Sequence, residues 1–202
     1  VPLTAIAFFM LTGELMTSAT ITDRLVALSR ALIGRIRGGL AQVNVLVSMF
    51  FAGMNGSVVA DTATVGALVL PAMKKAGYPA AFSAAVTGVS STIGGIIPPS
   101  IMMIVLANAT EISIAALFAA GIIPGILIGV VIMVINHYFA VKYNFERSDE
   151  PFSVRRAGKE LYRSSFALLI PLVLVGSVMG GVASVVEAGA ITALVALFTG
   201  VF

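Results

Sequence analysis

Several residue types that usually carry protein chemistry are missing or scarce in this chain of 202 residues. It has no cysteine, no tryptophan and one histidine. The absence of cysteine excludes disulfides and thiolate metal sites, and no Ser-His-Asp set, metal-binding histidine pair or phosphate-binding glycine loop occurs. The sequence therefore gives no support for an enzyme or an organic cofactor. Any chemistry is expected to come from oxygen atoms and backbone groups.

Charge is scarce as well. Only 10% of the residues are charged, whereas 59% are hydrophobic, and the mean hydropathy is +1.08. A water-soluble domain carries about 25% charged residues. The apolar residues form runs that are long enough for a helix to cross a membrane. This composition and arrangement indicate an all-α integral membrane protein. The chain begins with Val1 and ends within the apolar run 191–202, so we expect it to be part of a longer membrane protein.

The basic residues predict a topology. All twelve Lys and Arg residues fall in the windows 24–37, 74–75 and 142–163, whereas the connections at 108–112 and 180–187 carry only acid. The positive-inside rule places the basic windows in the cytoplasm and the acidic connections on the other side. Nucleic-acid binding is the alternative use of basic runs, but their placement between apolar spans favours topology. We expect contact with membrane lipid and none with nucleic acid.

The first part of the chain predicts one crossing and an arm. Residues 1–20 approach the length of a transmembrane helix. Within 21–39, apolar side chains recur at helical spacing with arginines around them, which predicts an amphipathic helix along the cytoplasmic interface. The alternative is an ordinary helix packed on protein with one solvated face. The apolar positions are Ile21, Leu25, Leu28, Leu32 and Ile36.

The next apolar segment, 40–73, has basic windows on both sides and must return to the side from which it enters. Two full spans need about 40 residues, and the segment is shorter than that. A re-entrant helical hairpin with its tip near Asn55 fits both length and charge. Together with 80–107, a span broken by "SSTIGGIIPPS" at 90–100, it is expected to form one unit, residues 40–107.

The rest of the chain predicts three further membrane helices. Residues 108–141 are expected to cross back, with Thr110 as the helix N-cap and Glu111 in the first turn. Residues 142–164 are polar and form a cytoplasmic connection. Residues 165–202 hold two transmembrane segments, the second of which begins at a capping box made by Ser184 and Glu187.

Two stretches break the rules of a membrane interior and are therefore the candidate site. At the hairpin tip, Gly56 permits a tight turn while Asn55 and Ser57 supply oxygens. In the broken span, glycines and prolines open the helix, and hydroxyls lie beside freed carbonyls. Broken helix ends can hold Na⁺ or an anionic substrate. The alternative for either loop alone is a kink or packing turn. The residues of the second loop are Ser90, Ser91, Thr92, Gly94, Gly95, Pro98 and Pro99.

Asp61 is the one acid well inside a predicted membrane segment. An intramembrane carboxylate is a functional hypothesis by default. It is expected to tune cation binding, carry a proton or contact substrate, with helix capping as the structural alternative. We expect the same kind of role for three other residues, which would contact either the substrate or the residues that bind the cation: Ser90, Pro98 and Pro99.

The order of these motifs resembles a known family. "FAGMNGSVVADTATVGALVLPAMKKAGY", then "SSTIGGIIPPSIMMIVLA" and "TEISIAALFAAGIIPGIL", are similar to the large membrane subunit of TRAP transporters, the tripartite ATP-independent periplasmic family. The resemblance covers nearly the whole chain. By motif position, Asn55, Gly56 and Ser57 match the first hairpin tip. The residues matching the loop associated with cation binding in the family are Ser91, Thr92, Gly94 and Gly95.

The resemblance implies a bacterial inner-membrane, multi-pass secondary transporter of the ion-transporter superfamily, with an elevator architecture and Na⁺-coupled uptake of an organic acid. The acid would be a C4-dicarboxylate, sialic acid or another sugar acid. The implied partners are a small membrane subunit and a periplasmic substrate-binding protein. In such a transporter 1–20 belongs to the scaffold, and 40–107 is half of the transport domain. The family has two inverted repeats, so this chain would hold one and the start of the next.

Two rival functions remain open at the level of sequence. One is a Na⁺- or H⁺-coupled organic-anion carrier of related architecture that needs no binding protein. The other is a membrane scaffold subunit that transports nothing.

Overall fold

The computed structural model describes residues 4–18, 21–145 and 153–201, and within these ranges it contains helices and no strand. This confirms the expected all-helical fold for the described part of the chain. Residues 1–3, 19–20, 146–152 and 202, which include the ends of the predicted 1–20 segment and part of the 142–164 connection, lie outside it. The helices are α1 (Thr4–Ser18), α2 (Ile21–Ile33), α3 (Gly39–Asn55), α4 (Val58–Lys75), α5 (Ala80–Ser91), the 3₁₀ helix η1 (Thr92–Gly95), α6 (Ile101–Thr110), α7 (Ile114–Lys142), α8 (Val154–Arg163), α9 (Ser165–Met179) and α10 (Val185–Val201).

Helix α7 is the longest described element, with 29 residues. Among the described residues it is the one unbroken helix whose length and composition suffice to cross a membrane. Two bent pairs, α1 with α2 and α8 with α9, could each supply one more span. The remaining apolar helices, such as α3 and α6, are shorter.

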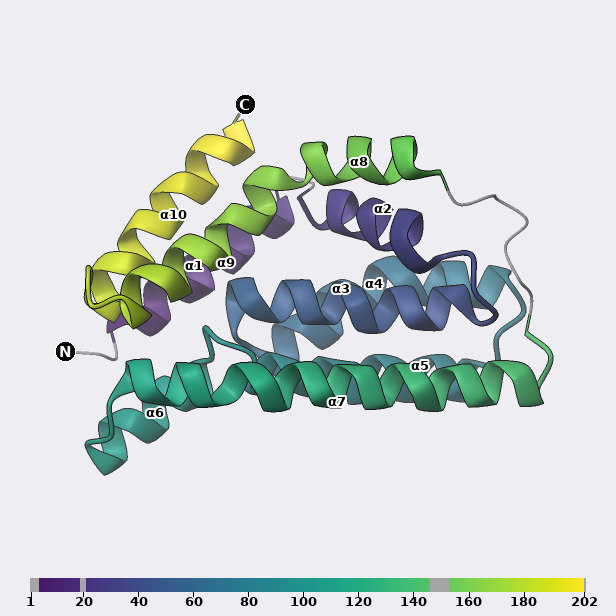
Figure 1. Ribbon diagram of the computed structural model, residues 1–202, viewed down its shortest axis with the longest axis horizontal. Coiled ribbons are helices and arrows are strands. Elements are labelled where there is room, and N and C mark those ends of the chain that lie inside the picture. The colour runs from purple at the N-terminus through teal and green to yellow at the C-terminus, as the bar shows by residue number, and fades with distance from the viewer. Residues whose placement is uncertain (1–3, 19–20, 146–152, 202) are drawn as a thin grey trace.

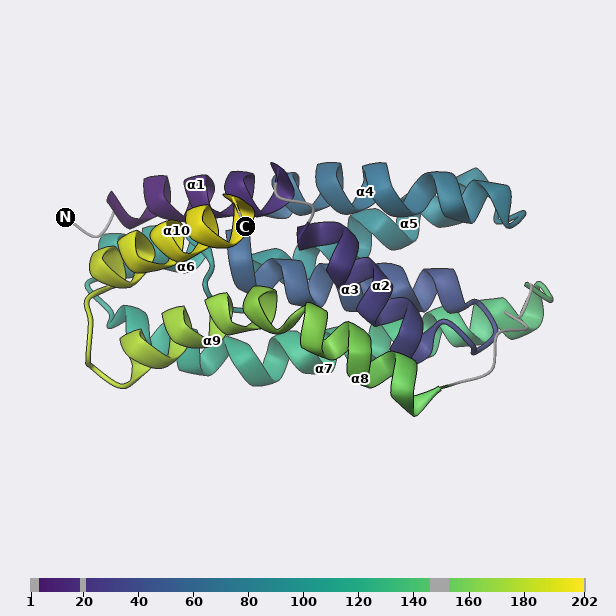
Figure 2. The same ribbon diagram turned by 90° about the horizontal axis from the view of Figure 1, so that it is seen from above.

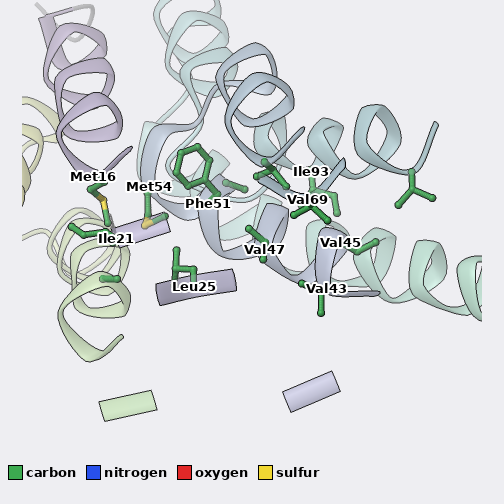
Figure 3. Close-up of a cluster of buried hydrophobic side chains, with 14 of the residues drawn as sticks. Met16, Ile21, Leu25, Val43, Val45, Val47, Phe51, Met54, Val69 and Ile93 are labelled. Carbon is green, nitrogen blue, oxygen red and sulfur yellow. The ribbon is translucent and has the colours of Figure 1, made fainter. Parts of the chain in front are cut away.

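Helices α3, α4 and α5 form the centre of the molecule. The chain turns back between α3 and α4, so the two helices pack as an antiparallel hairpin, and α5 contacts both of them (Figure 1). The main buried cluster lies on α3, whose Val43, Val47 and Phe51 are fully buried (Figure 3). Burial on several sides explains why α3 is apolar almost all round rather than along one stripe.

Helix α2 packs on this centre. Ile21, Leu25 and Leu28 are buried, and the first two belong to the α3 cluster, whereas Leu32 and Ile36 are exposed. Helix α8 lies along α2 (Figures 1 and 2). The first half of the apolar face of α2 therefore contacts protein, as in the alternative interpretation of this segment.

A second cluster joins α1 to the last two helices. Phe9 of α1 packs with Leu174 of α9 and Ala188 of α10. The predicted capping box at the start of α10 is confirmed, because Ser184 N donates to Glu187 Oε2 at 2.8 Å and Glu187 N donates to Ser184 Oγ at 3.3 Å.

The predicted start of the long helix was wrong. Thr110 is the last residue of α6, and Glu111 follows it in a left-handed conformation with φ of 58°. Helix α7 begins only after Ser113, whose hydroxyl accepts from Ala116 N at 3.4 Å. Thr110 and Ser113 are both good N-cap residues, and the sequence did not reveal that the first of them closes a preceding helix.

Parts of the three basic windows meet at one end of the molecule. A Cβ placed on Gly38, just after the first window, would contact Ala140. The rings of Tyr78, after the second window, and Phe145, within the third, are 4.6 Å apart. The chain between α6 and α7 lies at the opposite end (Figure 1). This arrangement agrees with a common side for the basic windows.

Candidate functional site

The hairpin tip is closed by its own polar side chains. Gly56 adopts a left-handed conformation with φ of 60°, and its N–H donates to Ala52 O at 3.2 Å, which ends α3. Ser57 N donates to Asn55 Oδ1 at 3.0 Å, and Ser57 Oγ accepts from Ala60 N at 3.3 Å, which starts α4. The side-chain oxygens of the tip are therefore already in use as helix caps.

The Asn55 amide leaves one group without a partner. Its Nδ2 is buried and has no hydrogen bond among the described residues. Because Ser57 N–H can only donate, the oxygen of the amide must face it, and the assignment of Nδ2 is fixed. A buried orphan N–H suits an acceptor, such as a carboxylate or water, better than a cation. Helix α1 packs against this residue, since a Cβ on Gly13 would lie 2.6 Å from Asn55 Cβ.

The break in the following helix has a different construction. Helix α5 ends at Ser91, a 3₁₀ turn follows, and the bond between Pro98 and Pro99 is cis. Ser100 then caps α6: its Oγ donates to Gly95 O at 2.8 Å and accepts from Met103 N at 3.4 Å. Pro98 and Pro99 are buried. The loop is a compact, self-bonded segment that interrupts the helical ladder.

The structure brings the two loops together. Ile101 N, at the start of α6, donates to Gly56 O at 3.2 Å. A Cβ on Gly56 would contact Pro99 O, and a Cβ on Gly94 would lie 3.6 Å from Ser57 O. The hairpin tip and the helix break therefore meet backbone to backbone, and glycine at 56 is what allows that approach.

The hydroxyls predicted as ligands are mostly bonded to their own helix. Ser91 Oγ donates to Thr87 O at 2.8 Å, and Thr92 Oγ1 donates to Val89 O at 2.7 Å. Ser91 is buried, whereas Thr92 is exposed. Each hydroxyl keeps lone pairs that a cation could use. Their assignment as cation ligands stays a prediction, and so does that of Gly95.

A polar network that the sequence reasoning missed lies between α3 and α5. Asn44 Nδ2 donates to Thr87 Oγ1 at 2.7 Å, and Ser90 Oγ lies 3.2 Å from Asn44 Oδ1, to which it can donate. Ser48 Oγ donates to Ser90 Oγ at 3.3 Å. All four side chains are buried. One sequence signal could have revealed this network. Asn44 and Ser48 are polar residues four positions apart in a mostly apolar helix, so they lie on one helical face.

Asp61 lies in the first turn of α4 beside this network. It is fully buried, and neither carboxylate oxygen has a hydrogen-bond partner among the described residues. Its neighbours include Ser48 and Ser91. A helix N-terminus favours an acid by about 0.3–1 kcal/mol, whereas burying an unpaired ion costs several kcal/mol. Helix capping alone therefore does not account for a carboxylate here.

The described residues hold no group of three or more His, Asp or Glu side chains that could bind a metal ion. An open hollow of about 690 Å³ follows the outer face of α4 and is lined by residues of that helix. None of the predicted site residues lines it. The candidate site is thus the contact between the two loops together with the buried polar groups of α3, α4 and α5.

Comparison with known proteins gives one consistent family. The family described as "Tripartite ATP-independent periplasmic transporter, DctM component" matches residues 1–202. The chain is 37% identical to the sialic acid TRAP transporter large permease protein SiaM of Vibrio cholerae, over 98% of this chain and 46% of that protein. It is also 37% identical to the C4-dicarboxylate TRAP transporter large permease protein DctM of Pseudomonas aeruginosa, over 99% of this chain and 47% of that protein.

A third relative, the 2,3-diketo-L-gulonate TRAP transporter large permease protein YiaN of Escherichia coli, is 37% identical over 97% of this chain and 46% of its own length. The chain thus spans about half the length of these curated relatives. The substrates in the names of these three relatives differ, although each relative is 37% identical to this chain. The match over all 202 residues shows that this chain belongs to the DctM component family of tripartite ATP-independent periplasmic transporters.

Proposed function

We propose that this chain is one part of the large membrane subunit of a Na⁺-coupled transporter that imports an organic acid across the bacterial inner membrane. The observation that carries the proposal is the contact between the hairpin tip and the helix break. Two broken helix ends that face each other inside an apolar protein bring backbone carbonyls and amides to one point. Such a point suits a desolvated ion or a carboxylate better than it suits simple packing.

The two loops contain groups suited to an ion and groups suited to a substrate. The carbonyl groups around Gly56 and Gly94 suit Na⁺, which prefers oxygen ligands. The orphan Nδ2 of Asn55 suits an acceptor oxygen, as on a carboxylate. The names of the three relatives contain sialic acid, C4-dicarboxylate and 2,3-diketo-L-gulonate. We therefore propose an organic acid as the substrate class and do not choose among these acids.

We further propose the partners and the motion. A periplasmic binding protein would deliver the acid, and a small membrane subunit would support the large one. Residues 40–107 would move as part of the transport domain in an elevator-type motion, while α1 belongs to the scaffold. The close packing of α3, α4 and α5 supports movement as one body.

The test is uptake by the complete transporter reconstituted in proteoliposomes. A panel of labelled acids, including sialic acid, a C4-dicarboxylate and a sugar acid, is offered with and without a Na⁺ gradient and the binding protein. We expect uptake of one class only, and only with both the gradient and the binding protein. Equal uptake with and without the Na⁺ gradient would refute the coupling. Uptake without the binding protein would favour the organic-anion carrier that needs no such partner.

A further inference from the structure

Helix α8 presents three different faces. It packs against α2, and Ala157 is its buried residue. Beside that contact runs an apolar strip, and a basic strip follows further round the helix, each with the residue spacing of one helical face. All eight positions are exposed. The apolar strip consists of Val154, Gly158, Leu161 and Tyr162, and the basic strip of Arg155, Arg156, Lys159 and Arg163.

The apolar strip is uncovered and continues onto α9. A Cβ placed on Gly158 would have no atom of the described residues within 4 Å. Helix α9 begins at Ser165 after a bend of 59°, and exposed apolar side chains recur along it as Phe166, Leu169 and Leu172. Because α9 carries no charged residue, it can lie among lipid chains, whereas α8 cannot enter them fully. The bend therefore places α8 at the boundary between the apolar core of the membrane and the headgroups.

Arginines of α2 extend the basic strip. Helices α2 and α8 lie side by side on one outer side of the molecule (Figures 1 and 2), and Ser164 Oγ donates to Arg24 O at 3.2 Å. Residues 21–37 and 153–163 together contain eight Lys or Arg residues and two acids. Residues 146–152 add one Arg and three acids, so the total stays positive.

Much of this charge is not neutralised within the described part of the chain. Arg163 Nη1 donates to Glu160 Oε1 at 3.4 Å, in an exposed ion pair. The side chains of Arg155 and Lys159 have no hydrogen bond or ion pair with any described residue. Side chains of this kind can lay their carbon stems along an apolar surface and keep the charge at the level of the headgroups.

We propose that α8, with the adjoining arginines of α2, binds the phosphate groups of anionic phospholipid headgroups. Positive charge beside an apolar strip matches a lipid of this class, because its negative headgroup adjoins apolar chains. An acidic protein surface would match the charge but not the apolar strip that continues onto α9. The surface includes none of the residues assigned to ion or substrate, so it is independent of the proposed coupling. Bound lipid would hold α2 and α8 at the membrane boundary, on the side of the basic windows.

The experiment uses a fluorescent reporter on α8 of the purified complete transporter in a neutral detergent. Gly158→Cys, after removal of other thiols, carries an environment-sensitive dye in the uncovered strip, and phosphatidylglycerol or phosphatidylcholine is titrated in. Arg155→Gln with Lys159→Gln removes two charges from α8. Lys74→Gln with Lys75→Gln removes the same charge from exposed positions at the end of α4 and is the matched control.

We expect a dye response to phosphatidylglycerol at concentrations where phosphatidylcholine and inorganic phosphate give none. The α8 double variant should need about tenfold more phosphatidylglycerol or still more, because each basic side chain near the surface contributes to binding, and the α4 control should match the wild type.

Three results would overturn the proposal. Equal responses to the two lipids would leave an acidic protein as the partner of this surface, and they can be observed even if the α8 double variant does not fold. A response to inorganic phosphate alone would assign the basic strip to a free anion. An equal shift in both double variants would mean that overall charge, and not α8, attracts the lipid. None of these results would affect Na⁺ coupling, which is measured by uptake.

Discussion

Among single residues, Gly56 has the strictest requirements. Its φ of 60° favours glycine, and its Cα faces the backbone of Pro99 and Ser100 with no room for a methyl group. Gly77 has a similar φ of 78° but nothing within 4 Å of a Cβ. These two glycines separate the cost of a left-handed backbone from the cost of losing the contact between the loops.

We predict that Gly56→Ala is far more damaging than Gly77→Ala. Each substitution costs about 1 kcal/mol or more for the backbone conformation, but only the first also pushes the hairpin tip away from the helix break. The melting temperature and the uptake of the complete transporter should both fall for Gly56→Ala, and uptake should persist for Gly77→Ala. Equal effects of the two changes would mean that the contact has no role beyond the turn.

A second residue-scale prediction concerns Thr87. Its hydroxyl donates to Ser83 O at 3.0 Å and accepts from Asn44 Nδ2. Thr87→Val keeps the shape but leaves a buried N–H with no good acceptor, which costs about 1–3 kcal/mol. Thr62 also donates to the carbonyl four residues back, Val58 O at 2.8 Å, but is exposed. Thr62→Val is therefore the matched control, and its melting temperature in detergent should stay near that of the wild type.

At the scale of elements, the two ends of the apolar face of α2 should respond differently to truncation. Leu25 is fully buried against the α3 cluster, whereas Leu32 is 42% exposed. We predict that Leu25→Ala destabilises the protein by about 2–5 kcal/mol and that Leu32→Ala has a much smaller effect. The comparison is made by thermal unfolding of the complete transporter. A larger loss from Leu32→Ala would show that α2 depends on the membrane interface more than on α3.

The elements also show what the sequence could and could not reveal. Glycines, prolines and basic windows marked the turn at Asn55–Ser57 and the interruption after Ser91, and the spacing of Ser184 and Glu187 marked the capping box, because these features are local. The start of α7 was misplaced because Thr110 and Ser113 are equally good caps. The Asn44–Thr87 bond was missed because it joins residues 43 positions apart, and no local pattern states which helix faces meet.

The individual roles within the site were hardest to predict. Asn55 was expected to give a cation its oxygen, yet that oxygen caps the tip and the amide nitrogen is the group without a partner. Whether a side chain forms a hydrogen bond with the backbone of its own turn depends on the backbone geometry, which residue types alone do not specify. Both loops were assigned to the candidate site because each is irregular, and the structure places them together.

At the scale of the whole molecule, the chain matches only about half of its relatives' length. A site made by two repeats would be incomplete without the second. We predict that these 202 residues alone, reconstituted in liposomes, take up no labelled acid under a Na⁺ gradient, while the complete subunit with its partners does. Na⁺-driven uptake by the isolated chain would show that one repeat suffices.

The central claim is that the hairpin tip and the helix break enclose one ion site, and thiol protection tests it most directly. This chain has no cysteine, so Val58→Cys would add its one thiol next to Gly95, where the Val58 side chain lies 3.4 Å from a Cβ placed on that glycine. Val59→Cys, at a position that is 79% exposed, is the control. Other thiols of the complete transporter are removed first. The account predicts that Na⁺ slows maleimide labelling of Val58→Cys relative to K⁺ at equal ionic strength and leaves Val59→Cys unchanged. Equal labelling of Val58→Cys in the two salts would contradict it.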